Sequence, residues 1–193
     1  MSVPLILASA SPRRLALLGQ IGLAPARVLP ADIDESVAPR ELPRAHALRI
    51  ATEKAKVVHA RLAPGERAVV LAADTVVACG RRILPKAEDD ATVTQCLKLL
   101  CGRRHTVMTA IALVDAGGKL RTRMIETKVA FRRLDDAEIA DYVKGGEGRG
   151  KAGGYAIQGR AAIFVRFLAG SYSNVVGLPL IETFQLLKAC GAA

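Results

Sequence analysis

The sequence predicts an α/β fold in which helices flank a mixed central sheet. Short apolar runs that suit buried strands alternate with longer segments whose apolar residues recur at helical spacing. Two long strand-like segments, 104–114 and 119–132, are joined around Gly117-Gly118, which is a hairpin signal. The alternation favours parallel neighbours and the hairpin requires an antiparallel pair, so the sheet should contain both kinds.

The N-terminal segment predicts a strand that runs directly into a helix. Residues 5–8 are apolar throughout, and Ser11 then stands at the N-cap position with Pro12 at the first helical position. A serine oxygen can accept from an orphan N–H there, and proline suits a position whose N–H has no helical partner. The expected apolar stripe of this helix is Leu15, Leu18 and Ile21, and its expected end is Gly22.

The middle of the chain predicts a second strand, a long helix and a hairpin. Residues 26–29 suit a short strand, and Pro43 opens a helical pattern that Pro64-Gly65 ends. The unbroken apolar run 68–73 predicts a buried strand that stops before Asp74, and residues 80–82 predict a turn into a strand at 83–84. The expected apolar face of the long helix comprises Leu48, Ala51, Ala55, Val58 and Leu62.

The C-terminal half predicts further helices and one more strand. Residues 89–100 suit a helix, and Asp135 with Glu138 forms a capping-box pattern for another helix through about residue 143. The glycine-rich, basic segment 145–154 suits a mobile loop, and 161–168 suits a strand. Gly177-Leu178-Pro179 opens a last helix whose expected apolar face is Leu180, Phe184 and Leu187.

The composition indicates a single folded domain over residues 1–193. Of the 193 residues, 51% are hydrophobic and 24% are charged, which suits a folded domain with a substantial core. The four cysteines show no C-x-x-C or zinc spacing, which favours free thiols in a reducing compartment. No apolar run reaches the length of a membrane span and no leader pattern is present, so we expect a cytoplasmic protein with no membrane partner.

The formal net charge of +10 indicates an anionic partner. The basic residues are dispersed and include four adjacent arginine pairs, and no basic block of five or more resembles a nucleic-acid arm. Aromatic residues make up only 4% of the chain, too few for an obvious base-stacking platform. A nucleic-acid partner is therefore not expected.

The turn from the first strand into the first helix suits an anion. Ser11-Pro12 begins the helix, and Arg13 and Arg14 lie in its first turn. A helix start that carries paired arginines can receive phosphate through its N–H groups and guanidinium forks. The alternative is a surface helix start with two solvated arginines.

Two carboxylates and two lysines complete a set that suits nucleotide chemistry. Glu35 lies in the acidic stretch 32–35, and Asp74 follows a buried strand, where open α/β sheets place catalytic groups. Solvated turns are the alternative for both. Arg13, Arg14, Lys54 and Lys86 could neutralise a triphosphate, and Glu35 and Asp74 could hold Mg²⁺ or Mn²⁺. No Walker A sequence is present, and the one G-x-G-x-x-G match, residues 148–153, lies in the expected glycine-rich loop and not between a strand and a helix, so neither a P-loop nor a Rossmann site is indicated.

Five sequence blocks together resemble the Maf family of nucleoside triphosphate pyrophosphatases. They occur in one order over nearly the whole chain, and each is weak alone. The blocks are Ala8-Ser9-Ala10-Ser11-Pro12-Arg13-Arg14, Asp34-Glu35-Ser36, Ala72-Ala73-Asp74-Thr75-Val76-Val77, Gly102-Arg103-Arg104-His105-Thr106-Val107 and Ser173-Asn174-Val175-Val176-Gly177-Leu178-Pro179-Leu180.

The resemblance implies a fold and an activity. The fold would be inosine triphosphatase-like (Maf/Ham1), with two lobes around a cleft, and commonly a homodimer. The activity would be hydrolysis of a nucleoside triphosphate to the monophosphate and pyrophosphate with a divalent cation. On the matching positions, Asp74, Glu35 and Lys86 would be catalytic, with Glu35 and Asp74 also holding the metal. The substrate-binding set would be Ser11, Arg13, Arg14, Lys54, Thr75 and Gln158.

The segment 151–159 is similar to the branch of the family that acts on dTTP and UTP. Arg13, Thr75 and Gln158 match the positions linked to that choice, and a glutamine amide can pair with the donor and acceptor edge of thymine or uracil. Modified pyrimidine nucleotides would also fit. One alternative is a 7-methyl-GTP pyrophosphatase, and another is a nucleic-acid-binding or septum-regulating protein without turnover. The chain departs from the family pattern at Pro85-Lys86, where lysine usually precedes proline, and at Cys101, where serine is usual.

Overall fold

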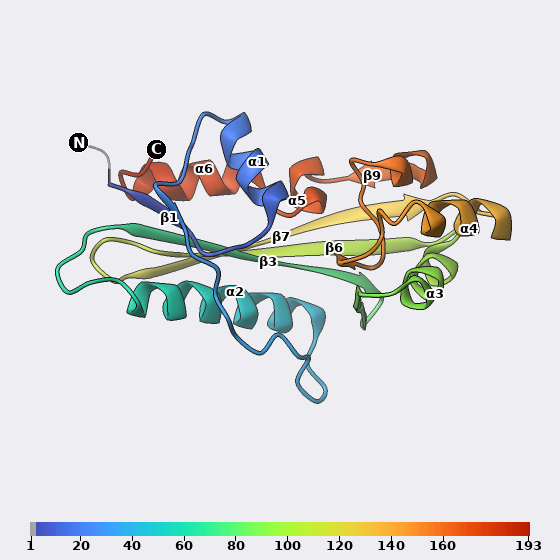
Figure 1. Cartoon of the computed structure of the whole chain (residues 1–193), viewed down its shortest axis with the longest axis horizontal. Coiled ribbons are helices and arrows are strands. Elements are labelled where there is room, and N and C mark those ends of the chain that lie inside the picture. Colours follow the sequence, from blue (N-terminus) through green and yellow to red (C-terminus); the bar gives the residue numbers. More distant parts are fainter. Residues whose placement is uncertain (1–2) are drawn as a thin grey trace. The chain divides into compact units, whose positions relative to one another are not determined.

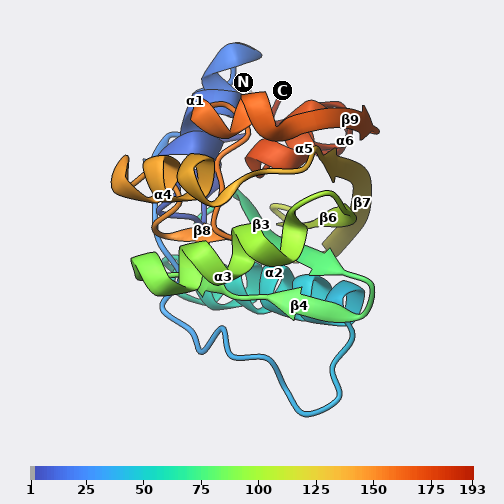
Figure 2. The same cartoon turned by 90° about the vertical axis from the view of Figure 1, so that its right-hand side faces the viewer.

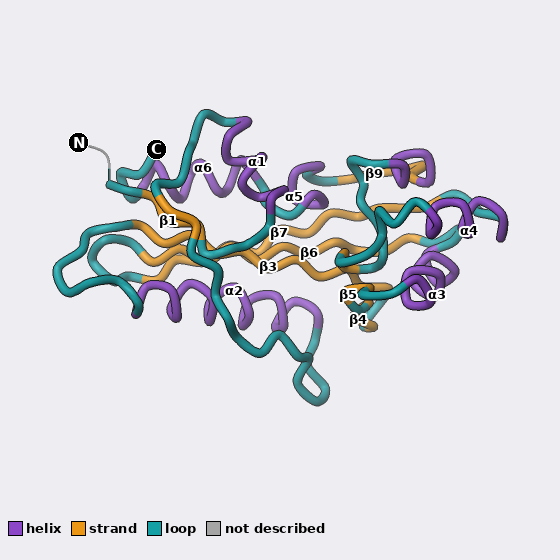
Figure 3. Tube along the Cα trace, viewed as in Figure 1, coloured by secondary structure: helices purple, strands orange, loops and turns teal. Residues whose placement is uncertain are grey.

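The computed structural model describes residues 3–193 and confirms the predicted α/β class with a mixed central sheet (Figure 1). The strands are β1 (Leu5–Leu7), β2 (Arg27–Val28), β3 (Val69–Cys79), β4 (Arg82–Leu84), β5 (Lys86–Ala87), β6 (Arg104–Val114), β7 (Leu120–Phe131), β8 (Lys151–Ala152) and β9 (Val165–Ala169). The helices are α1 (Pro12–Gln20), α2 (Pro43–Ala60), α3 (Asp90–Leu100), α4 (Asp136–Lys144), α5 (Tyr172–Val176) and α6 (Leu180–Ala189), with a 3₁₀ turn η1 at Arg160–Phe164. Figure 3 shows the long loop that leads into α2.

The sheet has parallel and antiparallel pairs, as predicted. Its strand order is β2-β1-β3-β6-β7-β9, and β4 also pairs with β3. β1 runs parallel to both β2 and β3, whereas β4 returns antiparallel along β3 (Figure 2) and β9 lies antiparallel to β7. A separate two-stranded sheet joins β5 to β8.

The chain divides into two compact units. The first holds Met1–Asp74, Thr109–Ile125 and Gly177–Ala193, of which residues 1 and 2 lie outside the described part. The second holds Thr75–Met108 and Glu126–Val176. β3, β6 and β7 each contribute residues to both units. In residues 3–193 no helix combines the length and apolarity that crossing a bilayer requires.

In the first unit, α2 covers one face of the β1–β3 region, and α1 and α6 cover the other (Figure 1). The buried face of α2 is centred on Ala47, Ala51, Lys54 and Val58, at the spacing of one helical stripe. Leu48 is turned about 100° from Ala47 around the axis and is 37% exposed, so its predicted place in the core is wrong. The predictions for Leu15 and Phe184 are wrong for the same reason, since the buried stripes centre on neighbouring residues.

The start of α1 lies where it was predicted but is capped differently. Ser11 is the N-cap and Pro12 the first helical residue, yet the Ser11 side chain makes no capping hydrogen bond. The Ser11 carbonyl instead accepts from the backbone N–H groups of Arg14 and Leu15. The Ser11 N–H donates to Ser9 Oγ over 3.3 Å.

β3 extends further than the apolar run predicted. It continues through Asp74 and Thr75 to Cys79, because Val76, Val77 and Ala78 restore a buried apolar run that pairs with β4. The prediction that Asp74 lies beyond the strand end is therefore wrong. Asp74 lies in the middle of β3, and the strand residues before and after it fix its backbone position.

The second unit is more ordered than its glycine content suggested. The segment predicted as a mobile loop contains β8, and Gly150 N and Gly153 N donate to the carbonyls of Ala87 and Pro85 over 2.7 and 3.0 Å. Gly153 has φ +69°, and a Cβ there would lie 2.9 Å from Val77 Cγ1. The predicted strand 161–168 begins instead as η1, and α5 was not predicted.

One buried amide joins three elements of the second unit. Asn174 of α5 is fully buried and donates through Nδ2 to Val107 O of β6 over 3.1 Å and to Thr127 Oγ1 of β7 over 2.9 Å. Thr127 Oγ1 also donates to Ser171 O. The Ser173-Asn174 block of the sequence thus fastens α5 to the sheet.

Asn174→Ala is expected to lower the free energy of unfolding by about 2 kcal/mol, because it leaves buried polar atoms without partners. Urea unfolding followed by circular dichroism measures this, since the chain has no tryptophan to report by fluorescence. Lys144→Ala, at an exposed site in the same unit, is the control. Equal stability of the two variants would contradict this role of Asn174.

Candidate active site

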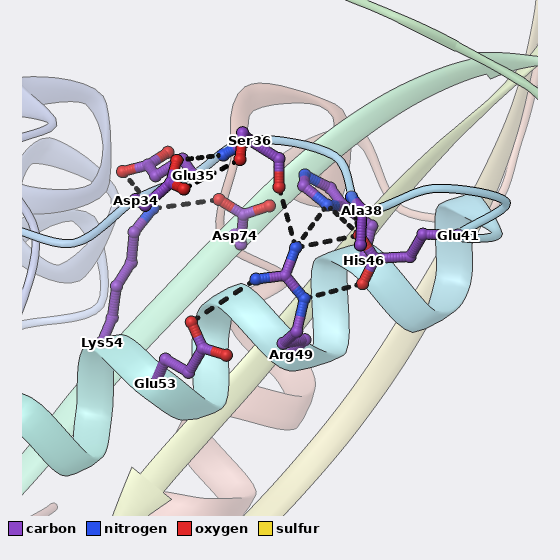
Figure 4. Close-up of polar contacts among 10 residues, drawn as sticks. All are labelled: Asp34, Glu35, Ser36, Ala38, Glu41, His46, Arg49, Glu53, Lys54 and Asp74. Carbon is purple, nitrogen blue, oxygen red and sulfur yellow. Dashed lines mark hydrogen bonds and ion pairs between the residues drawn. The ribbon is translucent and has the colours of Figure 1, made fainter.

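A buried lysine of the first unit links two carboxylates (Figure 4). Lys54 Nζ lies 3.0 Å from Asp74 Oδ1 and 2.9 Å from Glu35 Oε1. α2 supplies Lys54, β3 supplies Asp74, and the loop 29–42 between β2 and α2 supplies Glu35. Lys54 and Asp74 are 7% and 8% exposed, whereas the Glu35 side chain is 51% exposed. The trio is therefore a buried ion pair whose third member reaches solvent.

Lys54 is buried, although its sequence context suggested a solvent-exposed lysine. A lysine on a long helix is usually solvated, but this one lies on the buried stripe of α2. A buried ammonium is tolerated when it is paired and hydrogen-bonded. Asp74 and Glu35 meet that requirement, so the two carboxylates stabilise the charge of the Lys54 ammonium.

The donor set suits a divalent ion that arrives with phosphate. Within residues 3–193, no group of three or more His, Cys, Asp or Glu is arranged to hold a metal ion. Glu35 and Asp74 do face one cationic atom from two sides. Mg²⁺ in nucleotide sites is commonly held by one or two carboxylates, with phosphate oxygens and water completing its shell. The pair fits that arrangement and does not form an all-protein cage.

Arg14 is fixed in orientation by two neutral acceptors. Its Nε donates to Gly177 O over 2.8 Å, and its Nη1 donates to Ser9 Oγ over 3.0 Å. Burial lowers the pKa of Arg14, and the nearby Asp74 and Glu35 carboxylates oppose that shift. Arg14 thus belongs to the same electrostatic cluster as the trio. Sequence reasoning did not assign Ser9 to the site, because its contact with Arg14 depends on the direction in which the Arg14 side chain leaves α1.

The Nε–H group of Arg13 is a buried hydrogen-bond donor that no described residue accepts. The side chain is half-buried, burial lowers its pKa, and its Nε has no hydrogen-bond partner within residues 3–193. A desolvated donor without a partner raises the free energy of the site, and an anion oxygen would relieve that. The half-buried Ser11 hydroxyl is likewise not used as a helix cap. Both residues suit the predicted role in binding substrate.

The remaining predicted residues lie in the second unit. Thr75 is half-buried and follows Asp74 in β3. Lys86 lies in β5 with its side chain 66% exposed, and its Nζ is 3.3 Å from Glu88 Oε1. Gln158 is exposed between the buried Ile157 and the half-buried Gly159. The structure thus places Ser11, Arg13, Arg14, Glu35, Lys54 and Asp74 in one unit and Thr75, Lys86 and Gln158 in the other.

The turn that carries Gln158 is anchored on both sides. Before it, Tyr155 OH lies 2.8 Å from His105 Nε2, and Ala156 N donates to Tyr142 OH over 3.1 Å. After it, Arg160 N donates to Glu147 Oε2 over 2.8 Å. Within residues 3–193, the Gln158 side chain makes no hydrogen bond. The fold therefore holds the backbone of Gln158 and leaves its amide available.

His105 is a structural residue of this anchor. It is 2% exposed, and its ring meets those of Phe131 and Tyr155 edge to face at 5.0 and 5.5 Å. Burial lowers the pKa of His105 to about 4, so the ring is neutral near pH 7. The sequence could not indicate this pairing, since Tyr155 lies 50 residues away.

The two departures from the family pattern have local explanations. Pro85 uses its carbonyl to accept from Gly153 N, which joins the Lys86 strand to the glycine-rich segment. Cys101 Sγ donates to Leu134 O over 3.4 Å and accepts from Leu134 N over 3.1 Å. The thiol thus replaces a hydroxyl in a local contact outside the trio.

Comparison with known families tests the resemblance that the five sequence blocks indicate. The sequence model of the family described as "Maf-like protein" matches residues 4–190.

The chain belongs to the Maf family.

Curated relatives cover nearly all of this Maf-family chain. The dTTP/UTP pyrophosphatase of Caulobacter vibrioides is 62% identical over 187 residues, which span 97% of this chain and 95% of the relative. The dTTP/UTP pyrophosphatase of Rhodospirillum rubrum is 62% identical over 190 residues, spanning 98% of this chain and 89% of the relative. The resemblance stated from the five blocks is confirmed.

The solved structures support the predicted architecture. A HAM1 protein from Coxiella burnetii aligns with 97% of this Maf-family chain and 99% of its own, with a TM-score of 0.51 at 16% identity. Identity this low supports the fold and nothing finer. The expected Maf/Ham1 architecture is confirmed at the level of the fold.

His105 predicts a pH dependence of stability in this Maf-family chain. Its pKa is about 4 in the folded state and near 6.5 when exposed, so below pH 6.5 the unfolded chain binds a proton that the folded chain does not. Stability should be full above pH 6.5 and fall by up to ~3 kcal/mol between pH 6.5 and 4. Urea unfolding of wild type and His105→Leu across that range measures the difference. Equal pH slopes for the two proteins would contradict a buried neutral His105.

Proposed function

We propose that this Maf-family protein hydrolyses dTTP and UTP to the nucleoside monophosphate and pyrophosphate with Mg²⁺ or Mn²⁺. Relatives that carry the dTTP/UTP name, at 56–62% identity over nearly the whole chain, support the substrate class. The observation that carries the chemistry is the Glu35–Lys54–Asp74 trio, which places a buried carboxylate and a buried cation in contact. Modified pyrimidine triphosphates of the same shape fall within the proposal.

In the proposed reaction a water attacks the α-phosphorus. The new P–O bond forms as the bond from the α-phosphorus to the bridging oxygen breaks, and pyrophosphate leaves. Asp74 accepts the proton of the attacking water, a role that suits a fixed carboxylate in a poorly solvated position. Lys54 reduces the cost of keeping Asp74 charged there, because their atoms lie 3.0 Å apart.

The cationic side chains of the first unit bind the triphosphate. Arg13 has an unused buried donor, and Arg14 is oriented by Ser9 and Gly177. Fixed donors stabilise charge on phosphate oxygens more effectively than mobile ones, because they need no reorganisation. Glu35 and Asp74 would hold the divalent ion, which supplies neutralisation of phosphate charge. Lys86, exposed on β5, is proposed to act on the phosphates as a further cation.

Gln158 is proposed to recognise the base, together with Arg13 and Thr75. Its amide offers one acceptor and two donor hydrogens, which match the N3–H and carbonyl oxygens of uracil and thymine. The anchored backbone on either side reduces the entropy lost when that amide binds. Preference for 7-methyl-GTP in a substrate panel would contradict this assignment.

Location and assembly are also proposals. We propose a cytoplasmic homodimer that binds no nucleic acid, and the dispersed positive charge supports the last of these points. Size-exclusion chromatography with light scattering tests the dimer. Salt-dependent DNA or RNA binding without turnover would favour the regulatory alternative.

Asp74→Asn should reduce pyrophosphate release from dTTP and UTP by about 10³-fold, because the amide cannot accept the proton. The readout is product identification by phosphorus NMR, with circular dichroism as the check on folding. Release of orthophosphate by the wild type would place cleavage at another bond. Activity of the variant within threefold of wild type would remove Asp74 from the role of base.

Gln158→Leu should lower kcat/KM for UTP by about 10-fold or more, because the base loses its hydrogen-bond partners. Gln95→Leu, at an exposed glutamine of α3, is the matched control and should stay within twofold. Steady-state kinetics on UTP, dTTP, CTP and 7-methyl-GTP measures the selectivity. An equal loss on every substrate would show that Gln158 does not read the base.

A further inference from the structure

A second charged cluster joins His46 and Arg49, on the first two turns of α2, to Glu41, near the end of the loop that carries Glu35 (Figure 4). Arg49 Nε lies 2.7 Å from Glu41 Oε1, and Arg49 Nη2 lies 2.9 Å from Glu41 Oε2. This is a bidentate pair, the geometry in which an arginine–carboxylate contact is strongest. His46 Nδ1 lies 2.9 Å from Glu41 Oε2, and the Glu41 side chain is only 10% exposed. Glu41 therefore has partners on both oxygens.

Arg49 also contacts the loop next to Glu35. Its Nη2 donates to Ser36 O over 2.9 Å, and Ser36 directly follows Glu35. On the other side of Glu35, the Asp34 carboxylate accepts from Ser36 N and Ser36 Oγ, each over 2.9 Å. The backbone on both sides of Glu35 is thus held by side-chain hydrogen bonds.

The loop 29–42, here called the strap, needs such contacts because it contains no helix or strand. A loop without backbone ladders takes its position from side-chain bonds, and local opening is easy where these are few. Glu35 and Asp74 are both negative and face one ammonium, so repulsion between them favours a Glu35 that moves away. The Lys54 ion pair opposes that repulsion, but it holds only the end of a half-exposed side chain and does not position the loop backbone.

We propose that Arg49 and Glu41 form a brace that positions Glu35 against Lys54 for the reaction. Arg49 is a positioning residue, since it touches the strap and acts through Glu35. This inference rests on the proposed function, because it assigns Glu35 a part in the same site.

The chemistry of the brace explains why it uses arginine. One planar guanidinium serves Glu41 through two nitrogens and Ser36 O through one of them, a geometry that a lysine ammonium cannot reproduce. The Arg49 hydrogen bonds hold the pKa of Glu41 at about 2, so Glu41 is charged near pH 7 and the Glu41–Arg49 ion pair is retained there.

The first test is kinetic. Arg49→Met should lower kcat for UTP by about 10-fold with KM within threefold, because Glu35 acts in the chemical step. Arg49→Lys should be similarly impaired, and it serves as the second variant if Arg49→Met does not fold. Glu53→Gln is the matched control: Glu53 lies on the same helix, 3.5 Å from Arg49 Nη1, and should leave kcat within twofold. An unchanged kcat in both Arg49 variants would overturn the brace.

The second test separates positioning from general damage by coupling Arg49 to Glu35. In a Glu35→Gln background, assayed at high enzyme concentration, Arg49→Met should add no more than about a twofold loss, since the residue it positions is gone. A full additional 10-fold loss in the double variant would show that Arg49 does not act through Glu35.

The third test needs no activity. The strap contains Arg40, an exposed residue with φ 62°, and trypsin cleavage after it can be followed by mass spectrometry. Arg49→Met should speed this cleavage by about 10-fold relative to cleavage after Lys188 in α6, because local opening becomes easier. Equal acceleration at both sites would indicate global destabilisation and overturn the brace. If the wild type releases no pyrophosphate, the proposed function fails, whereas the strap measurement still decides whether Arg49 holds the strap.

Discussion

The buried Lys54 ammonium is the constraint on which the rest of the first unit depends. An amine in the α2 core stripe is tolerated only with charged partners within hydrogen-bond reach. Asp74 supplies one from the middle of β3, where strand geometry fixes its direction, and Glu35 supplies the other from the strap. The contact of α2 with the sheet and the contact of the strap with α2 therefore both supply a counterion to Lys54. The site and the core of this unit are stabilised by one set of contacts.

Fold class could be predicted because it depends on patterns that are local in the sequence. Alternating apolar runs, the Gly117-Gly118 hairpin and the Asp135–Glu138 capping box all appear in the structure. The errors share a cause, which is tertiary context. Leu48 is exposed because the sheet selects which stripe of α2 is buried, and β3 continues past Asp74 because β4 pairs with it. The buried face of a helix and the length of a strand both depend on neighbouring elements in space, and these cannot be identified from one sequence.

The same limit applies to the site. Residue types could be predicted, since phosphate needs arginine and lysine and a divalent ion needs carboxylates. Their supports could not be, because Arg14 reaches Gly177, Arg49 reaches Ser36, and His105 reaches Tyr155 across separations of 163, 13 and 50 residues. Residues 36, 155 and 177 all lie in segments that carry the family resemblance, but nothing in the sequence says which side chain each of them contacts. Residue types therefore indicate the chemistry of the site, whereas its geometry depends on contacts between distant parts of the chain.

The shared lysine has a consequence for the end of a reaction cycle. An ammonium whose only counterion is a bound ligand is left unpaired in a poorly solvated position when the ligand leaves. The free-energy cost of that unpaired charge slows release of the ligand. Lys54 already has two protein carboxylates as counterions. Loss of an anion near Lys54 therefore leaves this ammonium paired with protein carboxylates.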